Sequence, residues 1–130
     1  MRVMQKRIFP RVVTQIPAVI DNGDGLRFRA LALDASSEGL SIQCSVMQRN
    51  MITPGGSFVR NGKPVELFVQ IALPIEDGNA EFIDARCHVA FSRRLSRDIC
   101  QIGMRYAEIS QDQFLTLMAY IEENLSGSVE

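Results

Sequence analysis

Two arginines, Arg7 and Arg11, stand four residues apart in the segment KRIFPR near the start of the chain. The α conformation is disfavoured for Phe9 because this residue precedes Pro10. Pro10 itself has no amide hydrogen to donate in a helix, so we expect an extended or turning segment. Extended chain of this length spans up to ~17 Å, which lets two guanidinium groups approach a large ligand from different sides. Guanidinium groups bind phosphate oxygens and the O6/N7 edge of guanine, and they stack on bases. A ligand with both phosphates and guanines would use all three properties.

The segment DASSEG, residues 34–39, offers complementary groups. We expect Asp34 to end one strand and Gly39 to begin the next, with a chain reversal between them in which glycine supplies positive φ. The Asp34 carboxylate has two acceptors for N1–H and N2–H₂ of a guanine, and Ser36 adds a hydroxyl and turn amides for phosphate. Taken singly, each segment has a plainer interpretation: a solvated, charged N-terminus for the arginines and a simple turn for DASSEG.

Short apolar runs separated by turn residues continue from Arg11 to Tyr106, which is typical of an all-β sandwich or barrel. The expected strands cover 11–20, 26–34, 39–46, 65–73, 81–92 and 99–106, with a polar, glycine-rich loop from about 48 to 64. Alternation with a period of two assigns one face of these strands to the core. That face comprises Leu40, Ile42, Cys44 and Val46; Val65, Leu67, Val69, Ile71 and Leu73; Ile83, Ala85, Cys87, Val89 and Phe91; and Cys100, Ile102, Met104 and Tyr106.

A helix is predicted to follow the strands and to lie across one opening or face of the sheet. Ser110 and Gln113 have the spacing of a capping box at its start. Its apolar residues recur at helical spacing: Phe114, Leu117, Met118, Ile121 and Leu125.

The bulk composition favours one globular domain. The chain has 130 residues, 46% of them hydrophobic, which suffices for one core without metals or disulfides. Its formal net charge of −1 creates no overall field that would gather nucleic acid or an anionic membrane. No run approaches the roughly 18 to 20 apolar residues of a spanning helix, and the N-terminus lacks the apolar centre of a signal peptide. We therefore expect a cytoplasmic protein without membrane insertion.

Several other chemistries find little support. The three cysteines lie in apolar runs, where reduced cysteine packs as a small hydrophobe. The single histidine, His88, faces away from Cys87 on a strand, so neither a metal site nor a Cys–His nucleophile is expected. No paired carboxylates suggest acid–base catalysis, so we do not expect an enzyme. A cluster of arginines could touch DNA or RNA, but neither the net charge nor an aromatic platform supports this: Arg93, Arg94, Arg97 and Arg105.

In combination, the two motifs resemble the PilZ domain family. RIFPR fits the R-x-x-x-R element and DASSEG fits the D-x-S-x-x-G element at every fixed position, with 22 residues between Arg11 and Asp34. The later segment IGMRYAEISQDQFLTLMAYI is similar to the closing strand and helix of the family, so the resemblance covers nearly the whole chain. It implies a six-stranded antiparallel β-barrel over residues 11–126 with a C-terminal amphipathic helix, preceded by a flexible N-terminal arm, residues 1–12.

The resemblance also implies a function. A PilZ domain of this kind binds cyclic di-GMP without chemically altering it, needs no cofactor, and in a bacterial cytosol passes the signal to a partner protein. Arg7 and Arg11 would wrap the dinucleotide, and Lys6, just before the motif, occupies a position associated with binding one ligand or an intercalated pair. The turn residues that hold the ligand would be Asp34, Ser36 and Gly39. The alternative is a protein-interaction barrel that does not bind the nucleotide.

Overall fold

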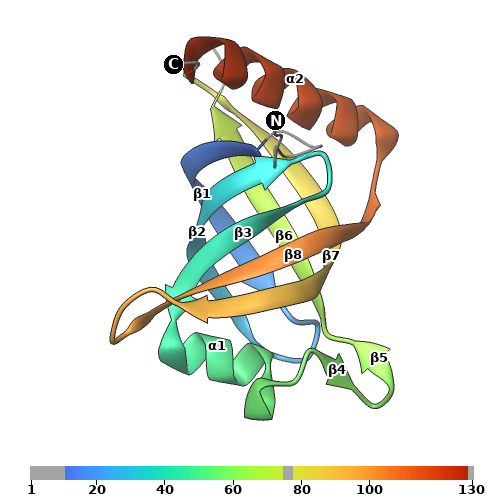
Figure 1. The fold of residues 1–130 in the computed structure, drawn as a ribbon. Helices are drawn as coiled ribbons and strands as arrows, with labels where there is room; N and C mark the ends of the chain where they lie inside the picture. The colour runs from blue at the N-terminus through green and yellow to red at the C-terminus, as the bar shows by residue number, and fades with distance from the viewer. Residues whose placement is uncertain (1–10, 75–77, 129–130) are drawn as a thin grey trace, which may run out of the picture.

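Six strands close into a barrel in the computed structural model, which describes residues 11–74 and 78–128, with side chains for 15–74 and 78–124 (Figure 1). The strands are β1 (Arg11–Asp21), β2 (Arg27–Ser36), β3 (Gly39–Ser45), β6 (Glu66–Pro74), β7 (Ala80–Arg94) and β8 (Ile99–Ile109). Their order around the barrel is β1-β2-β3-β8-β7-β6, and every neighbouring pair is antiparallel. The predicted six-stranded antiparallel barrel is confirmed.

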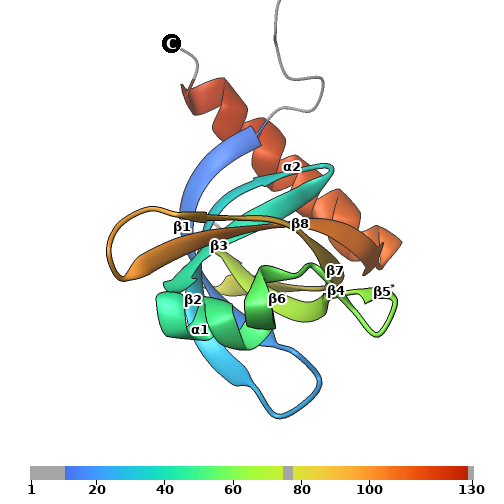
Figure 2. The ribbon, with the colours of Figure 1, turned by 60° about the horizontal axis from the view of Figure 1, so that its bottom comes forward.

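Helices close the two ends of the barrel, as Figures 1 and 2 show. The helix α2 (Gln111–Ser128) lies across one end and buries Leu117 and Ile121, so the predicted terminal helix is confirmed. At the other end lies α1 (Val46–Ile52), which buries Ile52. It is followed by a 3₁₀ turn, η1 (Pro54–Gly56), and a small hairpin of β4 (Val59–Arg60) and β5 (Lys63–Pro64).

The helix α1 corrects the prediction of a loop over about 48 to 64. Ser45 and Gln48 form a complete capping box: the Ser45 hydroxyl accepts from the Gln48 amide at 3.0 Å, and the Gln48 side chain accepts from the Ser45 amide at 2.9 Å. The box expected at α2 is only half formed, because the Ser110 hydroxyl accepts from the Gln113 amide at 3.2 Å. The Gln113 side chain instead accepts from the Asp84 amide of β7 at 2.8 Å, which ties α2 to the barrel.

The predicted core faces are buried with a few exceptions. Phe91 was expected inside, but its side chain is 42% exposed, because one extra residue, Ala90, shifts the pairing between β7 and β8. A bulge of this kind exchanges the inner and outer faces of the strand beyond it. Tyr106 is only half-buried, and Val46 belongs to α1.

The three cysteines are free and buried, and their burial makes stability depend on alkaline pH. Burial raises the pKa of the Cys87 thiol to about 12, and burial and the nearby Cys100 raise the pKa of Cys44 to about 11. In the unfolded chain a thiol ionises near pH 8.5. These thiols therefore contribute stability below that pH, and it is lost as the pH rises toward their folded values.

We expect the free energy of unfolding to fall above about pH 9, by up to ~1.4 kcal/mol per pH unit for each such thiol. Urea unfolding at pH 8 and pH 10, on the wild type and on Cys87→Ala, measures this. The fall between the two pH values should be smaller in Cys87→Ala than in the wild type. An equal fall in both proteins would contradict the assignment to Cys87.

Candidate functional site

The hairpin between β2 and β3 carries the D-x-S-x-x-G residues. The strand β2 continues beyond Asp34 to Ser36, so only Ser37 and Glu38 connect it to Gly39, a tighter reversal than predicted. The Ser36 side chain is fully buried and bonded within the turn. Its hydroxyl accepts from the Glu38 amide at 3.1 Å and donates to the Gly39 carbonyl at 3.4 Å. Ser36 therefore holds the shape of the turn.

A β-bulge in β2 sets the direction of Asp34. Ala32 pairs with Ile42 of β3 and Asp34 pairs with Ser41, so Leu33 is an extra residue on β2. Residues three positions apart face opposite sides of a regular strand. Because of the extra residue, however, Ala32 and Ala35 are both buried in the core. Asp34 is thereby directed to the outer surface, where its Oδ1 accepts from the Ser41 hydroxyl at 2.9 Å. No local pattern of residues indicates this bulge.

Gly39 is required for close packing against β8. Its φ is not positive, which corrects the reason given for a glycine here. A Cβ on Gly39 would overlap the carbonyl oxygen of Met104 and lie 2.9 Å from the Cα of Arg105. The strand β8 also anchors the turn through Tyr106, whose amide donates to the Glu38 carbonyl at 3.1 Å and whose hydroxyl donates to the Ser36 carbonyl at 3.0 Å.

The start of β1 lies beside this turn. In the antiparallel pairing of β1 with β2, Arg11 is opposite Ser36 and Val13 is opposite Asp34. The last residue of the R-x-x-x-R motif is thus a backbone neighbour of the D-x-S-x-x-G motif. Lys6 and Arg7 lie outside the described residues, as does the side chain of Arg11.

Arg105, one of the four arginines for which the sequence supports no contact with DNA or RNA, is a neighbour of the turn. It pairs directly with Gly39 across β3 and β8, and its side chain is exposed. Together with Glu38, Gly39 and Phe91, it lines a small hollow of about 280 Å³ on the outer face of the barrel. Alternation along β8, with Met104 buried, was the signal that could have placed Arg105 on this face.

The family of the chain follows from its sequence as a whole. The sequence pattern described as the PilZ domain matches residues 5–123, which include both motifs, the barrel and most of α2. The chain belongs to the PilZ domain family. No curated protein matches the sequence significantly.

Three solved structures have the same fold as this PilZ domain. The inhibitor of motility MotI/DgrA from Bacillus subtilis has a TM-score of 0.72 and 17% identity, covering 98% of this chain and 55% of that one. The PilZ domain of YcgR from Escherichia coli, solved with c-di-GMP, has a TM-score of 0.57 and 12% identity, covering 95% of each chain. PlzA from Borreliella burgdorferi, in complex with c-di-GMP, has a TM-score of 0.56 and 5% identity, covering 92% of this chain and 53% of that one. The chain spans about half the length of MotI and PlzA.

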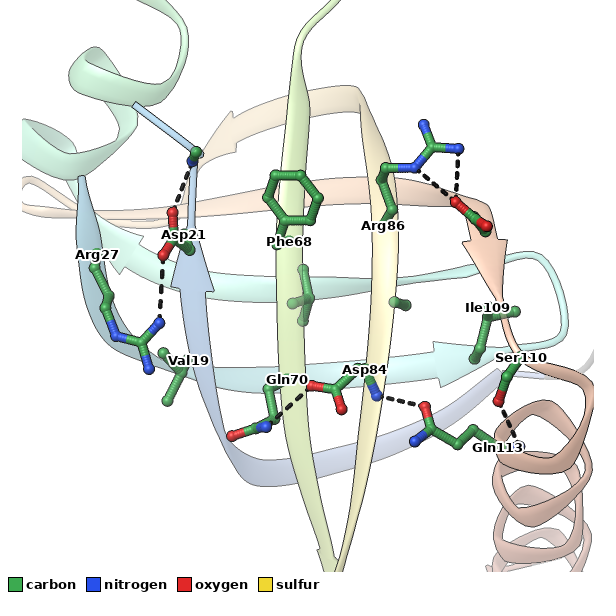
Figure 3. Close-up of a pocket in the computed structure, with 14 residues that line it drawn as sticks. Val19, Asp21, Arg27, Phe68, Gln70, Asp84, Arg86, Ile109, Ser110 and Gln113 are labelled. Carbon is green, nitrogen blue, oxygen red and sulfur yellow. Dashed lines mark hydrogen bonds and ion pairs between the residues drawn. The ribbon is translucent and has the colours of Figure 1, made fainter. Parts of the chain in front are cut away.

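A second and larger hollow of this PilZ domain, about 720 Å³, lies on another part of the barrel (Figure 3). It is formed mainly on the outer face of β1, β6 and β7, with the half-exposed Phe68 beside it. Three carboxylates and two guanidinium groups line it: Asp21, Asp84, Glu108, Arg27 and Arg86. Arg27 pairs with Asp21 at 3.3 Å, and Arg86 pairs with Glu66 and Glu108 at 2.7 and 3.1 Å. Acidic groups outnumber basic ones around this hollow, which we call the acidic surface. It therefore disfavours a ligand with two phosphates.

The described side chains also bear on a metal site, a Cys–His nucleophile and a membrane-spanning helix. Cys87 is buried in the core and His88 is half-buried, in agreement with their predicted opposite directions. Within the described ranges, no three or more histidine, cysteine or carboxylate side chains gather as a metal site would require. No helix in the described part of the chain is both long enough and apolar enough to cross a membrane.

Proposed function

We propose that this PilZ domain is a cyclic di-GMP receptor that binds the dinucleotide on the outer surface of the barrel, beside the β2–β3 turn, and does not alter it chemically. The observation that carries this proposal is the pairing of Arg11 with Ser36, which makes the two sequence motifs neighbours. The YcgR domain and PlzA, which share the fold, were solved with c-di-GMP. Proximity of the motifs is what one ligand touching both requires.

The proposed roles follow from the chemistry of each side chain. Arg7 and Arg11 grip guanine edges and phosphates, since guanidinium presents paired donors and a stacking face. Asp34 accepts from N1–H and N2–H₂ of one guanine. Arg105, exposed beside Gly39, adds a cation for the phosphates.

The remaining motif residues have supporting roles in this proposal. Ser36 and Gly39 shape the turn through the contacts described above and present its backbone amides to the ligand. Lys6 stands immediately before the first arginine and bears on whether one ligand or a stacked pair is bound.

Signal output would use the N-terminal arm. In this proposal residues 1–12 are the arm and residues 11–126 are the barrel domain. The backbone of Arg11 already pairs with Ser36, and ligand would fix Arg7 and the side chain of Arg11 against the turn. Binding then changes the surface that a downstream protein meets, in a bacterial cytoplasm. If the domain bound a partner without any nucleotide, it would instead be a protein-interaction barrel, which replacement of both arginines would leave active.

Calorimetric titration of the purified chain tests the ligand assignment, with cyclic di-GMP as ligand and GTP and cyclic di-AMP as controls. We expect cyclic di-GMP to bind saturably. Neither GTP nor cyclic di-AMP should compete with it for the protein at similar concentration. Absence of binding by a well-folded wild type would refute the receptor proposal and leave the interaction barrel.

Asp34→Ala should weaken cyclic di-GMP binding about 10- to 100-fold and should reduce the preference over cyclic di-AMP, because it removes the acceptors that read guanine. Titration of both ligands measures the two effects. Asp84→Ala is the matched control: Asp84 also accepts a side-chain hydrogen bond, from Gln70 at 3.0 Å, but on the acidic surface of β6 and β7. If Asp34→Ala rejected cyclic di-AMP as strongly as the wild type does, Asp34 would not be the residue that reads guanine.

A further inference from the structure

Four side chains from four adjacent strands form a continuous row of hydrogen bonds that ends at Asp34. Arg93 of β7 donates to the Gln101 side-chain oxygen of β8 through Nε at 3.1 Å and Nη2 at 2.9 Å. Gln101 Nε2 donates to the Ser41 hydroxyl of β3 at 2.9 Å. Ser41 in turn donates to Asp34 Oδ1 of β2 at 2.9 Å. We call this row the Arg93–Asp34 chain.

The direction of every bond in the Arg93–Asp34 chain is determined by its first member. A guanidinium group has only donors, so the Gln101 amide must turn its oxygen to Arg93 and its NH₂ to Ser41. The Ser41 hydroxyl has a single hydrogen, and with its oxygen already accepting from Gln101 that hydrogen is directed to Asp34. All donors therefore point toward the carboxylate.

The two middle members are shielded from water. Ser41 is 0% exposed and Gln101 is 7% exposed. Gly103, directly opposite Ser41, has no side chain, so Gln101 can reach Ser41 diagonally across the two strands. Hydrogen bonds in such surroundings are strengthened by the low dielectric and are costly to leave unmade. The bond from Ser41 therefore restrains the rotation of the Asp34 carboxylate.

We propose that Ser41 and Gln101 are positioning residues that set guanine selectivity by orienting the Asp34 carboxylate, with Arg93 fixing the direction of the chain. Guanine offers two adjacent donors, N1–H and N2–H₂, which a carboxylate can accept together only when its plane is aligned with the base. A carboxylate that has lost the bond from Ser41 would turn more readily and would accept from a single donor on another base. This inference rests on the proposed function, in which Asp34 reads guanine.

Cyclic di-GMP and cyclic di-inosine monophosphate, which lacks the guanine N2 amino group, are the probes. We would titrate each by calorimetry into the wild type, Ser41→Ala, Gln101→Leu and Gln101→Glu. Gln101→Glu keeps the size of the side chain and accepts from Arg93, but it cannot donate to Ser41. Since both ligands carry the same phosphates, its added negative charge cancels in the ratio of the two dissociation constants.

The matched control is Gln70→Leu, which also breaks a hydrogen bond from a glutamine amide to an aspartate, that of Gln70 to Asp84 at 3.0 Å. Its strand, β6, is opposite β3 in the barrel order. Thermal unfolding identifies any variant that fails to fold. If one of the three variants Ser41→Ala, Gln101→Leu and Gln101→Glu fails to fold, the other two still test the inference.

The preference of the wild type for cyclic di-GMP should fall about three- to tenfold in Ser41→Ala, Gln101→Leu and Gln101→Glu, the loss expected of one hydrogen bond, and should be unchanged in Gln70→Leu. If folded Gln101 variants bind cyclic di-GMP with the wild-type preference, the positioning role is refuted while the receptor function stands. If Gln101→Glu keeps the preference and Gln101→Leu loses it, the role of Gln101 is packing alone. If the wild type binds neither ligand, the receptor function itself is wrong and the inference fails with it.

Discussion

Replacing both Arg7 and Arg11 with alanine is expected to weaken cyclic di-GMP binding at least about 30-fold, because each guanidinium group contributes about 1 to 3 kcal/mol through paired, charge-assisted hydrogen bonds. The melting temperature without ligand should stay close to that of the wild type. The core of the described residues consists of apolar side chains, and a charged guanidinium group is not expected to pack among them. Calorimetry and thermal unfolding measure the two quantities.

The matched control is the double variant Arg94→Ala, Arg97→Ala. It removes the same charge from the β7–β8 hairpin, which lies at the end of the barrel near α1 and away from the β2–β3 turn (Figure 1). Two arginines attract an anion over a distance wherever they lie, but only those in contact with the ligand form directed bonds. If the two double variants lost the same affinity for cyclic di-GMP, the arginines would act only by general charge attraction. That result would contradict a clamp made by Arg7 and Arg11.

Gly39→Ala should lower the free energy of unfolding by about 3 kcal/mol and weaken ligand binding as well. The added methyl group would overlap backbone atoms of β8, the carbonyl oxygen of Met104 foremost, so β3 and β8 must separate at this point. Ser36 and Glu38 are held by bonds to Gly39 and to Tyr106, and their positions would change with that separation. Urea unfolding gives the free energy, and calorimetry gives the affinity.

Gly103→Ala provides the comparison, because a Cβ there would overlap the ring of Phe91, a side chain that can move, rather than backbone. Its cost should be smaller, and introducing Phe91→Ala should relieve it. The same second substitution should not relieve Gly39→Ala. Rescue of Gly39→Ala by Phe91→Ala, or a cost below that of Gly103→Ala, would show that contact with β8 is not the reason for glycine at position 39.

The strands could be predicted from the sequence because the alternation of residues within each strand indicates which face is buried. From Val65 to Leu73 every second residue is a large apolar one, and all five of these residues are buried. The bulges at Leu33 and Ala90 could not be predicted, since a bulge is a property of the pairing between two strands and leaves no local pattern. The helix α1 could have been found, because Ser45 and Gln48 have capping-box spacing that the adjoining strand pattern concealed.

The motif residues of the proposed site follow from a sequence pattern, but their surroundings do not. Asp34, Ser36 and Gly39 follow a recognisable spacing, and the structure places them at one β-hairpin, although Gly39 is needed for close packing and not for positive φ. Gln101 and Ser41 are 60 residues apart, and their contact arises only when β3 and β8 pair. The same pairing brings Arg105 beside Gly39.

The most direct test of the proposed binding surface is a titration of ¹⁵N-labelled protein with cyclic di-GMP, followed by ¹H–¹⁵N correlation spectra. Binding at the β2–β3 turn predicts that amide signals of 34–39 and of 11–13 shift and saturate together, while those of Phe68, Gln70 and Asp84 on the acidic surface stay in place (Figure 3). Spectra unchanged by the ligand, or shifts concentrated on the acidic surface, would contradict a receptor that holds cyclic di-GMP between its two motifs.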